Sequence, residues 1–256
     1  MSKPTGLIAN SGIELLTWGT PNGHKASIIL EELKEAYGKP DYVHQGINIG
    51  ENIQKEPWFT KLGPNGRIPV IVDHDKGGLS VMEGAAILTY LTRHYDPKHI
   101  FSFTEDPDLS YCEQWVAWQH ANHFYRLAKE RIAYPTQRYV GETERLFGVL
   151  DTQLKGKEYL VGNKYSIADI ASFSWVNIAY VAGLDINQFP DLKKWWQRIW
   201  DRPAVQRACS IPSESKLINA NFPGRLDDPE FKESEDKLKD ALKQAREQYN
   251  YKYASP

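Results

Sequence analysis

The sequence predicts an α/β domain followed by an all-helical domain. Up to residue 97, strand and helix patterns follow one another in the order β-α-β and then, after a connection, β-β-α, which is typical of an α/β domain. Beyond residue 97 the strand patterns stop and only helical spacing remains. The length of 256 residues suits two modest domains. We therefore expect domains at 11–97 and 108–212, followed by a charged extension at 213–256.

The β-α-β unit begins with a short apolar strand at 13–17, and the turn after it contains Pro21 and two glycines. Helical spacing follows over 25–36. The side chains predicted to face water on this helix are Glu31, Glu32, Lys34 and Glu35. Residues 42–49 alternate well enough for a second strand. The side chains expected on one side of that strand are Val43, Gln45, Ile47 and Ile49.

The remaining elements follow from turn chemistry and apolar spacing. Apolar runs at 69–72 and 79–81 flank a polar, glycine-containing turn, which predicts a hairpin, and a helix should cover 83–94. The helices expected in the second domain cover 109–133, 137–155, 166–182 and 191–201. Ser166 and Asp169 stand three residues apart at a helix start, which predicts a capping box worth about 1 kcal/mol.

Composition argues against several classes of function. The 31 Lys and Arg residues oppose 33 Asp and Glu residues, for a net charge of −2, so we expect no nucleic-acid partner. No apolar run approaches the roughly 20 residues of a membrane helix, and residues 1–10 lack the apolar core of a secretory signal, so we expect a cytoplasmic protein with no membrane partner. Cys112 and Cys209 form no CxxC pair, which argues against a disulfide scaffold, a zinc site or a dithiol centre.

The turn at 20–25, Thr-Pro-Asn-Gly-His-Lys, presents polar side chains at the positive end of a predicted helix. The hydroxyl of Thr20 and the amide of Asn22 are donors that can hold a thiolate there. The pKa of a thiol, ordinarily near 8.5, is lowered by roughly one to two units in such a setting. The alternative is an ordinary helix N-cap by Thr20 or Asn22.

Two further positions suggest a ligand. Pro69 directly precedes an apolar strand, and a cis Ile68–Pro69 bond would turn the Ile68 backbone outward to pair with an extended peptide ligand. The alternative is a plain tight turn. Glu83 stands at a helix start, where its carboxylate either caps the helix or receives a ligand ammonium.

Taken together, these motifs resemble those of the cytosolic glutathione transferases over residues 12 to 210. The matching segments are the turn at 20–25, Pro-Asn-Gly-Arg-Ile-Pro at 64–69, Glu-Gly-Ala-Ala-Ile-Leu at 83–88 and Tyr-Ser-Ile-Ala-Asp-Ile at 165–170. Within that family the chain looks most like the bacterial Nu class and the fungal relatives of the yeast nitrogen-regulator prion, which lack a catalytic Tyr or Ser near the first strand; no Tyr lies between Gly12 and Tyr37. The resemblance implies a thioredoxin-like N-terminal domain, an all-α C-terminal domain and a homodimer.

The resemblance also implies roles for particular residues. Asn22, with Thr20 beside it, would hydrogen-bond the glutathione sulfur; Ile68 would pair with the cysteinyl unit and Pro69 would be the cis proline. Glu83 would bind the γ-glutamyl ammonium. Further residues expected to contact the tripeptide are Gln54 and Arg138, with Arg67 and His24 as charge partners of its carboxylates or else surface residues.

Gly84 departs from the family pattern, which usually has Glu-Ser at this point. That serine ordinarily donates to the γ-glutamyl carboxylate. Gly84 keeps its backbone N–H but lacks the hydroxyl, which removes a bond worth roughly 1.5 to 3 kcal/mol. We therefore expect weakened but real glutathione binding.

A second-substrate site is expected between the domains. Its candidate wall residues are Trp18, Trp118, His120, His123, Phe124 and Tyr125. The alternative for Trp118, together with Trp115, is packing in the helical core or a dimer seam. Packing is also expected for Trp195, Trp196 and Trp200. His120 and His123 have no partner carboxylate motif, so no metal is expected.

The predicted function is a glutathione transferase that activates the glutathione thiolate for attack on a small hydrophobic electrophile or a disulfide, by conjugation or glutathione-dependent disulfide reduction. Glutathione is the co-substrate. The alternatives are a glutathione-binding regulatory or ligand-holding protein with little turnover, and an isomerase or conjugating enzyme of a fungal natural-product pathway.

Overall fold

The computed structural model describes residues 3–119, 133–179 and 184–213 and single positions between 233 and 248. Its first part contains a four-stranded sheet in the order β2-β1-β3-β4. The strands are β1 (Ile13–Thr17), β2 (Tyr42–Gly46), β3 (Val70–Asp73) and β4 (Leu79–Met82). β1 pairs parallel with β2, while β3 runs antiparallel to both β1 and β4. The predicted β-α-β and β-β-α order is confirmed.

The two faces of the sheet bury different sets of side chains because successive residues of a strand point to opposite sides. Ile13 and Leu15 of β1 join the larger core, which also contains side chains of α1 (Pro21–Tyr37) and α3 (Gly84–Tyr95). Leu16 belongs to a smaller cluster on the other face. That cluster is closed by the short helices η2 (Ile53–Lys55) and α2 (Pro57–Thr60), which follow the exposed η1 (Ile49–Glu51). A further short helix, η3 (His74–Lys76), lies in the hairpin turn.

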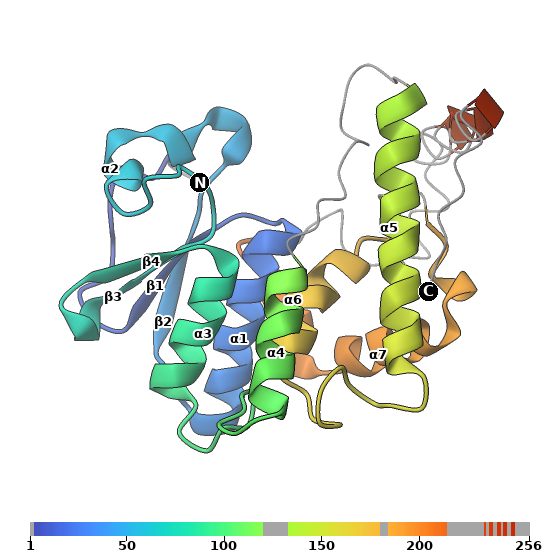
Figure 1. The fold of residues 1–256 in the computed structure, drawn as a ribbon. Coiled ribbons are helices and arrows are strands. Elements are labelled where there is room, and N and C mark those ends of the chain that lie inside the picture. Colours follow the sequence, from blue (N-terminus) through green and yellow to red (C-terminus); the bar gives the residue numbers. More distant parts are fainter. Residues whose placement is uncertain are drawn as a thin grey trace.

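The rest of the described chain is helical, as predicted. The elements are α4 (Asp108–Trp118), α5 (Ala133–Leu154), α6 (Ile167–Val176), η5 (Ile186–Gln188), α7 (Pro190–Trp200) and α8 (Pro203–Cys209). Figure 1 shows α4 and α6 beside α1 and α3, with α5 and α7 farther from the sheet. One hydrophobic core therefore runs from the sheet through α6 into the helical part. None of the described helices is long and apolar enough to span a membrane.

Helix α1 is tied to the end of the helical part by ion pairs. Arg202 donates to both carboxylate oxygens of Glu32 over 2.5 and 2.7 Å, and Arg207 donates to Glu31 over 2.7 Å. Glu32 is only 1% exposed, so the prediction that Glu31 and Glu32 face water is wrong. The acidic face of this helix is covered because α8, which the sequence patterns did not predict, packs against it.

The capping box predicted from Ser166 is confirmed at the start of α6. The Ser166 side chain accepts from the Ala168 backbone, and Asp169 Oδ2 accepts from Ser166 N over 3.0 Å. Asp169 does more than cap, because its Oδ1 also accepts from Leu160 N over 3.0 Å and from Trp195 Nε1 over 2.8 Å. The buried carboxylate therefore joins α6, α7 and the loop before α6.

Several predicted boundaries are corrected. The strand at 42–49 ends at Gly46, and Val43 and Ile49 are exposed while Gln45 and Ile47 are buried, because the chain turns into η1 after the strand. The helix predicted over 166–182 ends at Val176. Of the helix predicted over 109–133, the structure describes α4, which ends at Trp118 with Gln119 as its C-cap, while residues 120–132 lie outside the described part.

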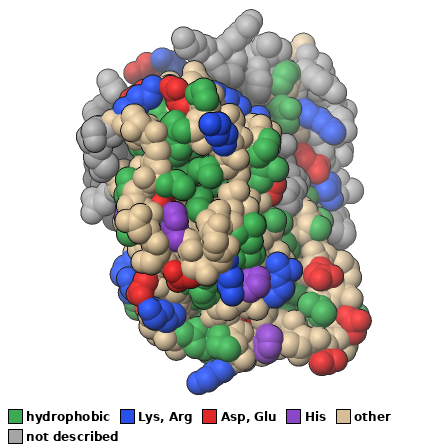
Figure 2. Space-filling view, turned by 90° about the vertical axis from the view of Figure 1, so that its left-hand side faces the viewer, with side chains coloured by type: hydrophobic (Ala, Val, Ile, Leu, Met, Phe, Trp, Pro, Cys, Tyr) green, Lys and Arg blue, Asp and Glu red, His purple; other side chains and the backbone are tan. Residues whose placement is uncertain are grey.

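The aromatic side chains pack largely as expected. Trp195 and Trp196 are fully buried, and Trp200 stacks on Trp196 with the planes 6° apart. Trp115 and Trp118 meet edge to face with ring centroids 5.1 Å apart, at the margin of the core. In the extension, Lys237 pairs with Glu233 over 2.5 Å, and most of the other extension residues lie outside the described part. Figure 2 shows acidic and basic side chains interspersed over one face of the molecule.

Candidate functional site

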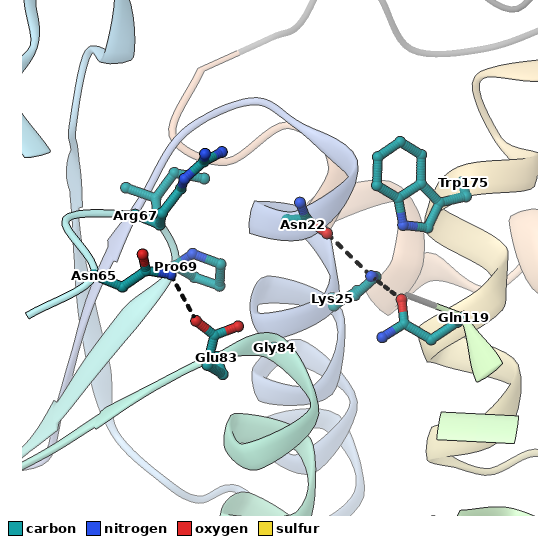
Figure 3. A pocket seen from close by; sticks show the side chains of 10 residues that line it. Asn22, Lys25, Asn65, Arg67, Pro69, Glu83, Gly84, Gln119 and Trp175 are labelled. Atoms are coloured by element: carbon teal, nitrogen blue, oxygen red, sulfur yellow. Dashed lines mark hydrogen bonds between the residues drawn. The ribbon is translucent and has the colours of Figure 1, made fainter. Parts of the chain in front are cut away.

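A cavity of about 380 Å³ opens between the sheet domain and the helical part. Its wall combines the start of α1, the segment before β3, the start of α3, the end of α4 and α6. The lining residues are Asn22, Lys25, Asn65, Arg67, Ile68, Pro69, Glu83, Gly84, Gln119 and Trp175. The volume lies in the range usual for small-molecule sites. Figure 3 shows Asn65, Arg67, Pro69 and Glu83 on one side and Asn22, Lys25, Gln119 and Trp175 on the other.

The start of α1 brings Asn22 into this wall. Thr20 is the N-cap: its side chain accepts from Gly23 N over 3.2 Å, and Pro21 occupies the first helical turn. A Cβ at Gly23 would lie 2.1 Å from the carbonyl oxygen of Trp18, so only glycine permits this close return of the chain. Thr20 thus serves as the cap that the sequence offered as an alternative, and it does not line the cavity.

Asn22 is held in one orientation by Lys25, one helical turn farther along. Lys25 Nζ donates to Asn22 Oδ1 over 3.1 Å and also to Gln119 Oε1, which comes from the end of α4. Because the amide oxygen of Asn22 accepts from Lys25, its Nδ2 group is the end of the amide that remains to donate to a ligand in the cavity (Figure 3). The cavity wall therefore carries an oriented amide donor at the positive end of α1.

Lys25 is the most perturbed basic group of this wall. Its side chain is buried, with 2% of its surface exposed, and desolvation lowers the pKa of the amine to about 7. Its Nζ lies 5.5 Å from the centre of the Trp175 ring, a cation–π distance. Near neutral pH this amine is therefore divided between its charged and neutral forms.

Glu83 supplies the acidic group of the site. It occupies the N-cap position of α3 but makes no side-chain cap, and its backbone has φ +72°. Its Oε1 accepts instead from Asn65 Nδ2 over 3.1 Å (Figure 3). The sequence left two roles open for Glu83, capping the helix or receiving a ligand ammonium, and the side chain does not cap the helix in this structure.

The loop before β3 forms the third side of the cavity. The Ile68–Pro69 peptide bond is cis, as predicted, and both residues line the cavity beside Arg67. Six residues that the sequence assigned to ligand binding or catalysis thus come together in one wall. They are Asn22, Arg67, Ile68, Pro69, Glu83 and Gly84.

Other predicted site residues lie outside this wall. His24 is 2% exposed rather than on the surface, and burial lowers its pKa to about 4, so it is neutral at pH 7 and supplies no charge. Gln54 is buried and donates weakly to Ile49 O over 3.5 Å. Arg138 is exposed on α5, and Trp18 packs against Gly46.

The predicted second-substrate residues are only partly described. Trp118 lines a small hollow together with Gln119 and Trp175, beside the main cavity. It also lines a cavity of about 780 Å³ between α4 and the segment 156–163 that follows α5, which includes Trp115. The remaining candidates, His120, His123, Phe124 and Tyr125, lie outside the described residues. Within the described part, no group of three or more His, Cys, Asp or Glu residues could hold a metal ion.

Four lining residues were not assigned to the site from the sequence: Lys25, Asn65, Gln119 and Trp175. Lys25 has a usable signal, because residues three apart on a helix share a face and Lys25 follows Asn22 by three. Asn65 stands within the quoted Pro-Asn-Gly-Arg motif. Gln119 and Trp175 carry no such signal, since they reach the cavity only through packing of α6 against α1 and of α4 against α6.

Comparison with known proteins identifies the family. Residues 20–94 match "Glutathione S-transferase, N-terminal domain" and residues 115–203 match "Glutathione S-transferase, C-terminal domain". The chain is 37% identical to the disulfide-bond oxidoreductase YfcG of Escherichia coli, over 77% of this chain and 94% of that protein.

Solved structures agree. A glutathione transferase homolog from Lodderomyces elongisporus, with two GSH per subunit, has a TM-score of 0.73 at 37% identity, covering 79% of this chain and 99% of that one. Ure2p in complex with glutathione has a TM-score of 0.72 at 28% identity, covering 79% and 96%. The chain belongs to the glutathione S-transferase family.

Proposed function

We propose that the cavity binds glutathione and presents its thiolate to an electrophilic carbon or to a disulfide sulfur. One observation carries this proposal. The same wall holds an oriented amide donor at Asn22, a buried amine at Lys25 and, at Glu83, a carboxylate that does not cap its helix. Glutathione combines a thiol, an ammonium and two carboxylates, which require complementary groups of these kinds.

Each end of the tripeptide has a partner in the wall. Asn22 Nδ2 donates to the sulfur, Glu83 receives the γ-glutamyl ammonium, and the Ile68 backbone pairs with the cysteinyl unit before Pro69. Arg67, exposed at the rim of the cavity, takes a carboxylate. Thr20 supports the sulfur site by capping α1 rather than by touching the ligand.

The reaction needs no cysteine of this chain. Cys112 and Cys209 are buried, and burial raises the pKa of both thiols, to about 11 and about 12. The working thiol therefore arrives with glutathione. In conjugation the thiolate forms a carbon–sulfur bond and expels a leaving group; with a disulfide it forms a mixed disulfide and expels the other sulfur as a thiolate.

Two of the comparisons support the disulfide branch. YfcG is a disulfide-bond oxidoreductase by name, and the Lodderomyces structure holds two GSH per subunit. Two glutathione molecules are the stoichiometry for complete reduction of one disulfide. The absence of a Tyr between Gly12 and Tyr37 and the likeness to Ure2p support placing the chain with the Nu-class and prion-related members.

A glutathione-holding protein with little turnover is the second candidate, and Gly84 favours it. This position lacks the serine hydroxyl that the family usually presents to the γ-glutamyl carboxylate. A γ-glutamyl end that is held by fewer hydrogen bonds leaves the glutathione thiolate less precisely oriented toward a second substrate.

The subunits form a homodimer, in which the sheet domain of one subunit faces the helical part of the other, and the protein acts in the cytoplasm. The domains divide at 11–97 and 108–212, which agrees with the end of α3 at Tyr95 and the start of α4 at Asp108. Light scattering at micromolar protein tests the dimer, and a monomer alone would contradict it.

Calorimetry with glutathione, followed by rate measurements with an aryl halide and a small disulfide, tests the function. We expect binding at millimolar ligand, disulfide reduction by the wild-type protein, and a loss of about 100-fold in Asn22→Ala. No binding rejects the proposal. Binding without turnover on either substrate supports the holding protein, and unchanged turnover in Asn22→Ala rejects the role of Asn22.

A further inference from the structure

The wall of the cavity contains a basic group, the Lys25 amine, that has no part in the glutathione contacts proposed so far. Lys25 is buried at the floor formed by α1, α4 and α6, yet it lines the same cavity as Asn22 (Figure 3). Its Nζ lies 3.1 Å from the amide oxygen of the residue proposed to hold the glutathione sulfur. We infer that the Lys25 amine takes up the proton of the bound glutathione thiol and then, as an ammonium, stabilises the thiolate held by Asn22. This inference rests on the proposed function.

The hydrogen bonds of Lys25 suit a neutral amine. A neutral amine has two N–H donors and one lone pair, and Lys25 Nζ donates to two acceptors, Asn22 Oδ1 and Gln119 Oε1. Both bonds persist in either protonation state, so Asn22 stays oriented throughout. The lone pair remains to accept a proton.

The charged groups around Lys25 do not fix the protonation state of its amine, so a bound ligand can change that state. Within the described residues, the other ionisable groups that line the cavity are Glu83 and Arg67, which carry opposite charges. His24, its neighbour on α1, is neutral at pH 7, and Asp169 of α6 lies near the opposite end of that helix from Trp175. Arg202 and Arg207, which approach α1 from the segment around α8, are engaged by Glu32 and Glu31.

Desolvation is therefore the main influence on this amine, and it lowers the pKa to about 7. A thiolate arriving beside it favours the ammonium, and the Trp175 ring at 5.5 Å does the same. The proton moves from sulfur to nitrogen, so that a neutral pair becomes an ion pair inside the cavity. The proton transfer itself leaves the net charge of the cavity unchanged.

The proton is then available for the leaving group. In disulfide reduction, the glutathione thiolate bonds to one sulfur and the second sulfur leaves as a thiolate with the electron pair of the broken bond. The Lys25 ammonium returns its proton to that sulfur. The sum is one thiol and one disulfide converted into one mixed disulfide and one thiol, and Lys25 is again a neutral amine.

The direct test counts protons when glutathione binds at about pH 8, by calorimetry in buffers of different ionisation enthalpy, together with the ultraviolet absorbance of the thiolate. We expect the wild-type complex to show thiolate absorbance and to release close to no protons. Lys25→Arg keeps the positive charge but accepts no proton, so it should show thiolate and release about one proton per glutathione.

Lys25→Met should bind glutathione largely as the thiol, with thiolate absorbance no greater than that of free glutathione, and its kcat near neutral pH should fall about 100-fold. Lys34→Met, at an exposed lysine of the same helix, is the matched control and should behave as the wild type. A wild-type complex that forms thiolate and releases about one proton overturns the inference, as does an unchanged thiol pKa in Lys25→Met. No glutathione binding by the wild type overturns the proposed function itself. The proton count on the wild type is decisive even where a variant fails to fold.

Discussion

Glu83 accepts a hydrogen bond from Asn65 over 3.1 Å while its own backbone has φ +72°, ahead of a helix that it does not cap. A non-glycine residue in such a conformation costs about 1 to 3 kcal/mol. The conformation points the carboxylate toward Asn65 and the cavity instead of the free N–H groups of α3 (Figure 3). The arrangement suits reception of a ligand ammonium.

Replacing Glu83 by glutamine tests this role. Gln keeps the size and an acceptor oxygen for Asn65 but removes the charge, so we expect glutathione affinity to fall about 10- to 100-fold. Calorimetry measures it, with exposed Glu51→Gln as the control outside the cavity. A glutathione analogue without the γ-glutamyl amine should bind the wild type and Glu83→Gln equally; an equal loss with both ligands would reject the ammonium contact.

Gly84→Ser should strengthen glutathione binding. A Cβ at Gly84 would lie 3.6 Å from Lys25 Cδ, which is ordinary van der Waals contact, so the side chain fits. The added hydroxyl supplies a donor for the γ-glutamyl carboxylate, and we expect a gain of about 10- to 100-fold over Gly84→Ala, which adds the Cβ alone. Equal affinities of the two variants would show that the backbone already holds this carboxylate.

The free energy of unfolding should depend on pH through Lys25. Its pKa is about 7 in the folded protein and 10.5 as the ordinary value, so between these pH values unfolding takes up a proton. The unfolded state binds more protons there, and stability rises with pH by at most about 1.4 kcal/mol per unit. Urea unfolding at several pH values should show this rise in Lys34→Met and lose it in Lys25→Met. Parallel curves for the two variants would mean that the folded amine titrates normally.

Asp169 should be needed for stability rather than chemistry. Asp169→Ala leaves the donors of Leu160, Ser166 and Trp195 unpaired in the core, and each costs about 1 to 3 kcal/mol. We expect a loss of at least about 3 kcal/mol in urea unfolding. Asp201→Ala, at an exposed carboxylate on the end of α7, should change stability by less than about 0.5 kcal/mol. Similar losses of unfolding free energy in both variants would contradict the stabilising role of the three hydrogen bonds to Asp169.

Local patterns were sufficient for the fold class and for the parts of the site that are built from turns. The strand 13–17, the cap at Ser166 and the cavity residues Asn22, Pro69 and Glu83 all depend on neighbouring residues in the chain. Turn and cap chemistry is short-range, so the sequence displays it.

Long-range packing decided the rest. Lys25 looks like an ordinary helix-surface lysine until Gln119, 94 residues later, lies against it. Glu32 is predicted to be exposed until Arg202 and α8 cover it. Neither partner can be inferred from the spacing of residues around α1, because both contacts arise from the way the helical part docks on the sheet domain.

The pKa of the glutathione thiol in the wild-type complex tests the account most directly. It is obtained from the thiolate absorbance of the complex as a function of pH, with free glutathione as the reference. The oriented amide of Asn22, the positive end of α1 and the Lys25 ammonium together predict a value roughly one to two units below the ordinary pKa near 8.5, and a return toward it in Asn22→Ala. A bound thiol that titrates like free glutathione would contradict the assignment of this cavity as a thiolate site.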